Sequence, residues 1–538
     1  MSYHVYSGEA ETREPLLTGG YLEPDHLDSD EGEIIFDRTS NLKHDAVGST
    51  RRKLTYEEAV EEAGFGLFHY LLLVVCGWAN ASDAVEILCV SFLLPTARCD
   101  LQLNSSDMGL LTASIFLGMM VGGYMWGYLA DQRGRRRVLV MSLTVNGLFG
   151  GLASIAPRFW LFLLLRFISG VGVGGSIPVI FSYFSEFMPR LRRGAMISAL
   201  ATFWMAGNIL AAGLAWVVIP NTWAHFQSWR LFVVLCSVPS LTSALLFRLL
   251  MPESPRFLME TGQEKEAIRV FQMMYKLNTC GKGKAFRECS LCCRSKKKPE
   301  LEDSRTLASR KEQLVNIVKK ALLPVKQMFK EKLKTRSIAL VIVFYCISFG
   351  YYGLWMWFPE LFERVEDGGS PCANVSRPSP LHNQSCYPVK TAVYMEGFVI
   401  AASNLPGNIF TILMMDSTGG KALLCFSLFM SSLSVFLIYL VHTKSQSLIL
   451  SCVFSGVSVI AWNALDVVGT ELYPTQLRSS ALGFFTGVGR VAAITGNIVF
   501  GKLVDTNCAV PVLLVSGLLL TGGLAALLLP QTRQTELT

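Results

Sequence analysis

The stretch Gly127-Tyr-Leu-Ala-Asp131-Gln-Arg133-Gly134-Arg135-Arg136-Arg137 joins two long apolar segments of the chain. Four of its eleven residues are arginines. Arginine is costly in hydrocarbon, so this stretch must turn at a water interface between two membrane-spanning segments. Because positively charged loops stay on the cytosolic side of a membrane, the turn is expected to be cytosolic. The stretch therefore predicts an integral membrane protein.

The composition of the whole chain agrees with this prediction. Of 538 residues, 51% are hydrophobic and 17% are charged, and the mean hydropathy is +0.40. Soluble domains carry about 25% charged residues. The apolar residues gather in twelve segments, each of roughly the 20 residues that cross a bilayer as a helix. The predicted spans are 66–94, 107–130, 138–156, 160–187, 195–219, 230–251, 337–361, 391–415, 422–441, 448–472, 479–501 and 508–529.

The charge distribution predicts an all-α integral membrane protein with twelve transmembrane helices in two pseudo-symmetric six-helix halves. Between Pro252 and Arg336 there are 21 Lys or Arg and 10 Asp or Glu, whereas the connections on the other side carry few charges. This asymmetry places both termini and the central loop in the cytosol. The expected parts are a disordered cytosolic tail at 1–60, a first bundle at 61–251, a basic loop at 252–335, a second bundle at 336–529 and a cytosolic tail at 530–538.

Glycosylation and disulfide signals lie on the predicted non-cytosolic side. The sequons begin at Asn104, Asn374 and Asn383, the last two in a short loop at 362–390. Cys372 and Cys386 lie in the same loop, which favours a disulfide between them. The cytosolic residues Cys280, Cys289, Cys292 and Cys293 have a spacing that fits no usual zinc site, so no metal is predicted. Palmitoylation of these thiols and unmodified thiols remain alternatives.

A charged motif occurs once in each half. Glu186-Phe-Met-Pro-Arg-Leu-Arg-Arg193 follows the fourth apolar segment, and Glu471-Leu-Tyr-Pro-Thr-Gln-Leu-Arg478 follows the tenth. A carboxylate and a guanidinium at the cytosolic end of a helix can pair and separate with conformation. We therefore predict gating roles for both pairs, together with Asp131 and Arg135. The alternative is that these charges are interfacial caps that only set topology.

Several motifs resemble those of known transporters. The pattern G-x-L-A-D-x-x-G-R-R, the glycine-rich run Arg166 to Gly175 and the sequence Pro252-Glu-Ser-Pro-Arg-Phe resemble the sugar-porter and organic-ion branches of the major facilitator superfamily. Four further stretches begin at Gly175, Phe349, Leu405 and Ala461, and the last reads Ala-Trp-Asn-Ala-Leu-Asp-Val. Together they are similar to the synaptic vesicle glycoprotein 2 family. The short 362–390 loop makes this chain a short relative that lacks the large lumenal domain of that family.

The resemblance implies a central substrate pocket. Its expected residues are Trp216, Tyr351, Tyr352, Trp462, Asn463 and Asp466. Trp462 lies four residues before Asp466, so both share one helix face. Aromatic faces beside a carboxylate can stack on a sugar or hold a cation. The alternative for Trp216 is a place in the interfacial aromatic belt.

Ionisable residues within the spans form a second set of candidates: Asp83, Glu86, Arg166, Glu396 and Arg490. Such residues are rare in membranes and mark functional sites by default. Buried acids suit coupling to protons and also suit a cationic substrate. The alternative is internal pairing that holds the bundle together, for example Glu86 with Arg166 or Asp466 with Arg490.

These features predict a monomeric vesicle-membrane secondary transporter of a small organic solute, either a sugar or an organic cation. It would work by alternating access, with a proton as the candidate coupling ion and lipid as the surrounding partner. The alternative function is a non-transporting vesicle glycoprotein that acts in trafficking, regulated secretion or as a receptor. Other endomembranes, the lysosome and the plasma membrane are alternative locations. No enzyme motif, cofactor site or nucleic-acid interface is predicted.

Overall fold

The computed structural model describes residues 53–221, 227–281, 290–291, 323, 325–330, 333–368, 372, 389–473 and 475–531. Within these residues, twelve helices are long and apolar enough to cross a membrane, which confirms the predicted fold class. The first six are α2 (Leu67–Asp100), α3 (Ser105–Arg133), α4 (Arg135–Leu152), α5 (Phe159–Ser185), α6 (Arg190–Val218) and α7 (Ser228–Leu250). The second six are α11 (Lys334–Gly368), α12 (Thr391–Thr418), α13 (Gly420–Leu440), α14 (Lys444–Glu471), α15 (Thr475–Leu503) and α16 (Ala509–Leu527).

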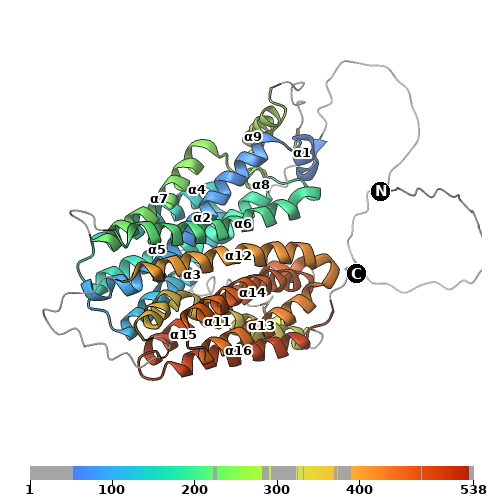
Figure 1. The fold of residues 1–538 in the computed structure, drawn as a ribbon. Coiled ribbons are helices and arrows are strands. Elements are labelled where there is room, and N and C mark those ends of the chain that lie inside the picture. The colour runs from blue at the N-terminus through green and yellow to red at the C-terminus, as the bar shows by residue number, and fades with distance from the viewer. Residues whose placement is uncertain are drawn as a thin grey trace, which may run out of the picture. The chain divides into compact units, whose positions relative to one another are not determined.

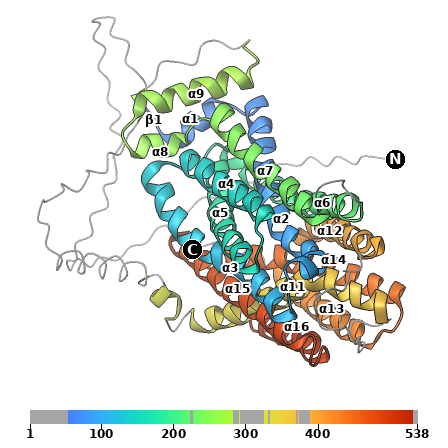
Figure 2. The same cartoon turned by 90° about the vertical axis from the view of Figure 1, so that its left-hand side faces the viewer.

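The twelve helices form two groups that follow the chain order. In Figures 1 and 2 the blue to green helices α2–α7 lie together, and the yellow to red helices α11–α16 lie together. We call these groups the N-half and the C-half. They meet where α3 packs against α15, α6 against α12 and α2 against α11.

The two halves share one backbone feature at the arginine-rich turn. Gly134 separates α3 from α4 with a φ of +98°, and Gly419 separates α12 from α13 with a φ of +87°. Only glycine adopts this left-handed region without a steric penalty. The turn therefore occurs at the same place in both halves, even though residues 416–421 of the second copy contain one lysine and no arginine.

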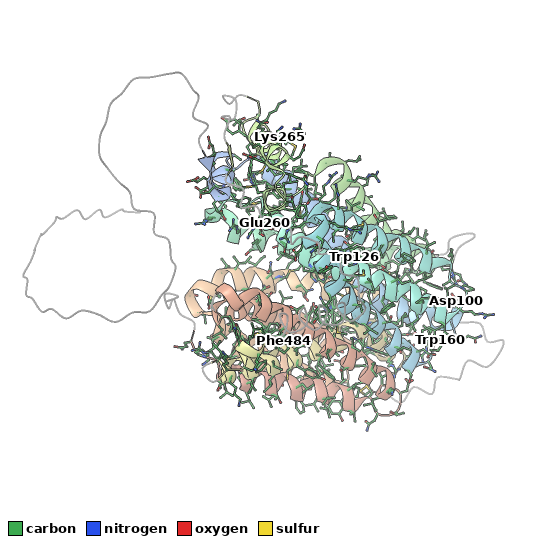
Figure 3. The ribbon with its side chains drawn as sticks, turned by 180° about the vertical axis from the view of Figure 1, so that it is seen from behind. Asp100, Trp126, Trp160, Glu260, Lys265 and Phe484 are labelled. Carbon is green, nitrogen blue, oxygen red and sulfur yellow. A yellow bond between two sulfur atoms is a disulfide. The ribbon has the colours of Figure 1, made fainter. Side chains whose placement is uncertain are left out.

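Small residues bring the helices of the N-half close together. A Cβ atom at Gly122 of α3 would lie 2.0 Å from the carbonyl oxygen of Val171 on α5. A Cβ atom at Gly175 would lie 2.1 Å from the ring of Trp126, which Figure 3 shows among the helices of this half. The glycine-rich run in the middle of α5 thus allows the close helix packing expected of small residues.

A small cap of short elements covers one end of the N-half. It consists of β1 (Lys53–Leu54), α1 (Tyr56–Glu62), α8 (Pro255–Glu260), α9 (Glu264–Asn278) and β2 (Ser290–Leu291), and β1 pairs with β2 in parallel. Asn278 ties this cap to the bundle, because it accepts a hydrogen bond from the backbone of Phe68 at 3.1 Å. We call this end of the bundle the α8 end.

The cap corrects the predicted boundary of the disordered tail at residue 60. Residues 56–60 of the predicted tail belong to α1, which starts at a capping box formed by Thr55 and Glu58. Ala59 and Val60 are fully buried.

Candidate substrate site and gates

A network of buried polar side chains lies in the middle of the N-half. Arg166 on α5 forms an ion pair with Glu86 on α2, and both side chains are fully buried. The hydroxyl of Ser169 lies 3.0 Å from the carboxylate of Glu86 and 3.0 Å from Oδ1 of Asn146, so its one hydrogen can be donated to either acceptor. A buried charge persists only when it is paired and hydrogen-bonded. The internal pairing considered for Glu86 and Arg166 is therefore present.

Asp83 belongs to the same network. It accepts hydrogen bonds from Ser176 at 2.6 Å and from Asn146 at 3.2 Å, and Asn146 also donates to Ser240 at 3.0 Å. Asp83 is fully buried. The network thus links α2, α4, α5 and α7, and its members face one another rather than solvent.

The C-half carries a cluster of aromatic side chains. The ring of Trp462 on α14 lies 6.1 Å from Tyr351 and 5.9 Å from Tyr352, both on α11. Tyr351 also stacks on Trp355 at 5.2 Å, and Phe116 of α3 lies 5.0 Å from Tyr352. Because Phe116 belongs to the N-half, the aromatic cluster lies where the two halves meet.

Polar groups lie next to this aromatic cluster. The side chain of Asp466 is exposed and lies one helical turn after Trp462. The Nε1 atom of Trp462 is buried and has no hydrogen-bond partner among the described residues. Asn463 donates a hydrogen bond to Asn408 on α12 at 2.9 Å. The arrangement offers aromatic faces, one unused N–H donor and one accessible carboxylate.

Asp466 lies near one end of α14 and not at its middle. It lies five residues before Glu471, the last residue of α14. At 1.5 Å per residue, this places it about 8 Å from the α8 end of the helix.

Three other predicted residues lie away from the aromatic cluster. Trp216 is 38% exposed and its ring lies 5.6 Å from Phe398 of α12. Glu396 is buried in the second turn of α12, where its Oε2 atom has no hydrogen-bond partner within the described part of the chain. Arg490 on α15 is half-buried, and no ion pair with Asp466 occurs among the described residues.

The N-half copy of the charged motif is tightly engaged at the α8 end. Glu186 is 6% exposed, and its carboxylate lies 2.8 Å from Nε of Arg135 and accepts a hydrogen bond from Ser254. Burial raises the pKa of Glu186, and the charge of Arg135 opposes this rise. Arg193 contacts Glu57 of α1 at 3.3 Å, so the acid and base of this motif pair with other residues and not with each other.

The C-half copy differs from the N-half copy. The side chain of Glu471 is exposed, and the side chains of Arg478 and Asp416 lie outside the described set. Asp131 is also exposed, with no ion pair in the described regions. Among the described side chains, the ion pairs of this motif with neighbouring residues therefore occur in the N-half copy.

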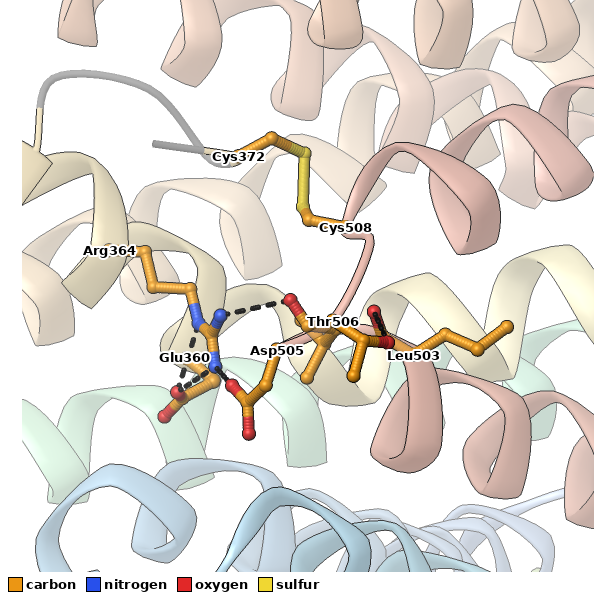
Figure 4. The surroundings of a disulfide bond; sticks show 8 residues. Glu360, Arg364, Cys372, Leu503, Asp505, Thr506 and Cys508 are labelled. Carbon is orange, nitrogen blue, oxygen red and sulfur yellow. Dashed lines mark hydrogen bonds and ion pairs between the residues drawn. A yellow bond between two sulfur atoms is a disulfide. The ribbon is translucent and has the colours of Figure 1, made fainter. Parts of the chain in front are cut away.

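A second set of ion pairs, absent from the sequence predictions, lies at the opposite end of the bundle (Figure 4). Arg98 of α2 contacts Glu360 of α11 at 3.0 Å, which joins the two halves. Glu360 also contacts Arg364 at 3.2 Å, and Arg364 contacts Asp505 at 2.6 Å. We call Arg98, Glu360, Arg364 and Asp505 the latch. The spacing of Glu360 and Arg364, four residues apart on a helix, was the available sequence signal.

The environment of Asp505 favours its charged form. Partial burial raises the pKa of this carboxyl, but the neighbouring Ser105 hydroxyl and Arg364 guanidinium lower it by more. The pKa of Asp505 therefore lies below its ordinary value.

A disulfide next to the latch corrects the predicted pairing of Cys372 with Cys386. Cys372 is bonded to Cys508, which lies in the turn between α15 and α16 (Figure 4). The prediction was wrong because the turn after α15 lies beside the end of α11, so a residue distant in sequence is near in space. Cys99, at the end of α2, is also disulfide-bonded. We call this end of the bundle the disulfide end.

The remaining modification sites are partly described. Asn104 is exposed and caps the start of α3 by accepting a hydrogen bond from Asp107 at 2.8 Å. Asn374, Asn383 and Cys386 lie outside the described residues, as do Cys289, Cys292 and Cys293.

Two six-helix halves that meet around an aromatic and carboxylate cluster define a transporter fold. The Major Facilitator Superfamily profile matches residues 73–381. Human synaptic vesicle glycoprotein 2B is 31% identical, over 90% of this chain and 86% of its own length. Rat synaptic vesicle glycoprotein 2C is 32% identical, over 89% of this chain and 80% of its own length. The chain therefore belongs to the major facilitator superfamily, in the branch that contains the synaptic vesicle glycoprotein 2 proteins.

Solved structures share the fold. The xylose transporter XylE from E. coli in an inward open conformation has a TM-score of 0.63 and 16% identity, covering 87% of this chain and 98% of its own. A D-xylose–proton symporter structure has a TM-score of 0.62 and 17% identity, covering 87% and 99%. The alignment with glycoprotein 2B is 596 residues long although this chain has 538, so that relative carries inserted residues that this chain lacks.

Proposed function

We propose that the protein is a secondary transporter of a small organic solute that works by alternating access. The solute binds between Trp462, Tyr351 and Tyr352, and Asp466 provides the charge. Support for the fold-level mechanism comes from the superfamily and from the two-half architecture, in which one half rocks against the other about a shared site.

The observation that carries this proposal is the aromatic cluster at the junction of the halves. Trp462 and the two tyrosines come from the C-half, whereas Phe116 comes from the N-half. A solute bound to both halves would be released when they rock apart. The unpartnered Nε1 of Trp462 supports a ligand role, because a buried donor without a partner costs free energy that a ligand oxygen would recover.

The chemistry of the cluster suits two solute classes. The aromatic faces stabilise a cation through its attraction to the ring quadrupole, and they also stack on the apolar face of a sugar ring. Asp466 would pair with a cation or accept a hydrogen bond from a sugar hydroxyl. Because Asp466 is exposed, it can exchange a proton with water, and we propose it as the coupling carboxylate.

We propose that the described conformation faces the cytosol. The excess of basic residues between α7 and α11 supports a cytosolic α8 end and cytosolic termini. At the disulfide end, the contact between Arg98 and Glu360 holds the halves together. Asp466 is accessible near the α8 end, and two structures of the xylose transporter XylE that share the fold are in inward open conformations.

We propose a vesicle membrane as the location and a monomer as the working unit. The names of the glycoprotein 2 relatives support the vesicle, and the disulfide at Cys372 supports an oxidising lumen at the disulfide end.

Uptake by the purified full-length chain in proteoliposomes tests this function. The probes are radiolabelled D-xylose, D-glucose and choline, each with and without an inward-directed proton gradient. We expect at least one probe to accumulate and the gradient to increase its uptake. Trp462→Ala should abolish that uptake, whereas Trp160→Ala, at a 68% exposed tryptophan on α5, should not. If no probe accumulates in protein that remains folded, the alternative of a non-transporting vesicle glycoprotein replaces the proposal.

A further inference from the structure

A cavity lined by arginines lies outside the candidate substrate site, at the α8 end of the N-half. Its volume is about 550 Å³, and its lining consists of Arg133, Arg136, Arg137, Val140, Met141 and Arg248. We call it the arginine pocket. The arginines come from the end of α3, the first turn of α4 and the last turn of α7. No acidic side chain lines it.

The arginine pocket is built by fixed contacts. Nε of Arg136 donates to the carbonyl oxygen of Phe247 at 3.2 Å, and Nη2 donates to the carbonyl oxygen of Arg248 at 2.6 Å. The backbone N–H of Arg136 donates to the carboxylate of Glu253 at 2.9 Å. The carboxylate of Glu253 also accepts a hydrogen bond from the backbone N–H of Ser254 at 3.1 Å, so it contacts the backbone at the start of α4 and just before α8. These contacts hold α4 against the end of α7 and shape the pocket.

Three arginines of the pocket are available to a ligand. Arg133, Arg137 and Arg248 are exposed, and none of them forms an ion pair within the described part of the chain. Asp131, the acid nearest to Arg133 in sequence, is exposed and does not line the cavity. Three uncompensated guanidinium groups converging on one cavity favour an anion with several negative charges, because arginine binds phosphate oxygens in a bidentate manner.

The surroundings of the pocket indicate where this anion comes from. Val140 and Met141 form its apolar side. Three exposed leucines lie farther from the α8 end on α4 and α7. Leu148 of α4 is 47% exposed, and Leu241 and Leu245 of α7 are 40% and 55% exposed. These leucines lie on α4 and α7, which are long and apolar enough to cross a membrane, so exposed apolar side chains extend from the arginines along both helices. Such a surface suits a molecule with a charged head and an apolar tail.

We propose that the arginine pocket binds the headgroup of a polyanionic phospholipid, a lipid that carries phosphate monoesters. Its phosphates contact Arg133, Arg137 and Arg248, and its acyl chains lie along the leucines of α4 and α7. Basic pockets between transmembrane helices on the cytosolic side bind such headgroups. The site joins α3, α4 and α7 at the end where Arg135 holds Glu186.

The test uses the full-length chain in nanodiscs of phosphatidylcholine. The first set also contains phosphatidylinositol 4,5-bisphosphate, and the second contains phosphatidylserine at matched total charge. Native mass spectrometry counts bound lipid, and thermal unfolding reports stabilisation. We expect binding of the bisphosphate lipid in preference to phosphatidylserine. Arg137→Gln/Arg248→Gln should weaken it about tenfold, since each arginine near a lipid surface contributes a few-fold.

A control double variant distinguishes specific binding in the arginine pocket from nonspecific electrostatic attraction of the anionic lipid. Lys265→Gln/Arg269→Gln removes the same charge from exposed positions on α9, outside the pocket, and should change binding by less than about twofold. An equal loss in both double variants would overturn the proposal, as would equal binding of the two lipids. Binding of soluble inositol 1,4,5-trisphosphate at the same affinity without any acyl chain would also overturn it, in favour of a soluble phosphate ligand.

Discussion

The two halves of the molecule use their polar residues differently. In the N-half, Glu86 and Arg166 are fully buried and paired, and Asp83 is held by Ser176 and Asn146. In the C-half, Asp466 is exposed, and Trp462 retains an unpartnered N–H beside it. Charges that pair with each other stabilise a rigid bundle, although Oε2 of Glu86 and Nε of Arg166 have no hydrogen-bond partner among the described residues. An exposed carboxylate beside an unpartnered donor can instead bind a ligand. We therefore propose that the N-half network acts as a scaffold and that the C-half residues bind the solute.

The charged motifs of the two halves show the same contrast. Glu186 contacts Arg135, Ser254 and the cap, whereas the side chain of Glu471 is exposed. The N-half therefore holds its α8 end together through many contacts.

The largest expected effect is on the buried ion pair. Arg166→Ala leaves the carboxylate of Glu86 buried without its partner, which costs roughly 3–5 kcal/mol. Arg490→Ala, at a half-buried arginine of the C-half, should cost less than about 1 kcal/mol. Thermal unfolding in detergent measures both. Equal stability of the two variants would break the proposed division between the halves.

The charged motif gives the next largest effect. Glu186→Gln removes a charge that contacts Arg135 and Ser254, and we expect a loss of roughly 1–3 kcal/mol. Glu471→Gln removes an exposed charge and should change the free energy of unfolding by under about 0.5 kcal/mol. The reverse ranking in thermal unfolding would show that the second copy of the motif is the engaged one.

The latch is expected to control conformation more than stability. Glu360→Gln weakens the contact of Arg98 with α11, so the halves should separate more often at the disulfide end. Spin labels at the exposed positions 158 and 446, one on each half, report this separation. We expect the long-distance population to rise at least about fivefold, the scale of a typical coupling free energy. Glu62→Gln, at an exposed acid of α1, is the control, and an unchanged distance distribution in Glu360→Gln would remove the latch from the mechanism.

The smallest expected effect is that of acid on the latch. The pKa of Asp505 is below its ordinary value of 3.8 in the folded protein. Its stabilising contribution is therefore complete above pH 3.8 and is lost only as the pH falls through the lowered value. Between pH 7 and about pH 5.5 the same spin-label distances should not change through Asp505. A pH-dependent opening that Asp505→Asn removes would contradict this.

The fold could be predicted from the sequence because each feature that indicates it extends over many residues. Twelve apolar segments and a basic central loop are averages over many residues, so no single contact could change them. The turn at Gly134 was predicted from its run of arginines, and the structure shows a matching glycine turn at Gly419 in the second half.

Single contacts between distant segments were harder to predict. The pairing of Cys372 with Cys508 and the contact of Arg98 with Glu360 depend on how helix ends meet in space, which no local pattern encodes. The sequence selected Tyr351 and Tyr352 together with Trp462, and the structure brings their rings together. It grouped Trp216 with them through the resemblance, but the described ring contact of Trp216 is with Phe398.

The central claim is that the solute and its coupling proton use Asp466 and not the buried acids of the N-half. Proton-driven uptake in proteoliposomes by Asp466→Asn and Asp83→Asn, measured side by side on variants with unchanged thermal unfolding, tests it most directly. We predict that Asp466→Asn loses uptake by at least about tenfold, since it removes a charge-assisted contact, whereas Asp83→Asn retains it. Loss of uptake in Asp83→Asn together with normal uptake in Asp466→Asn would contradict the assignment.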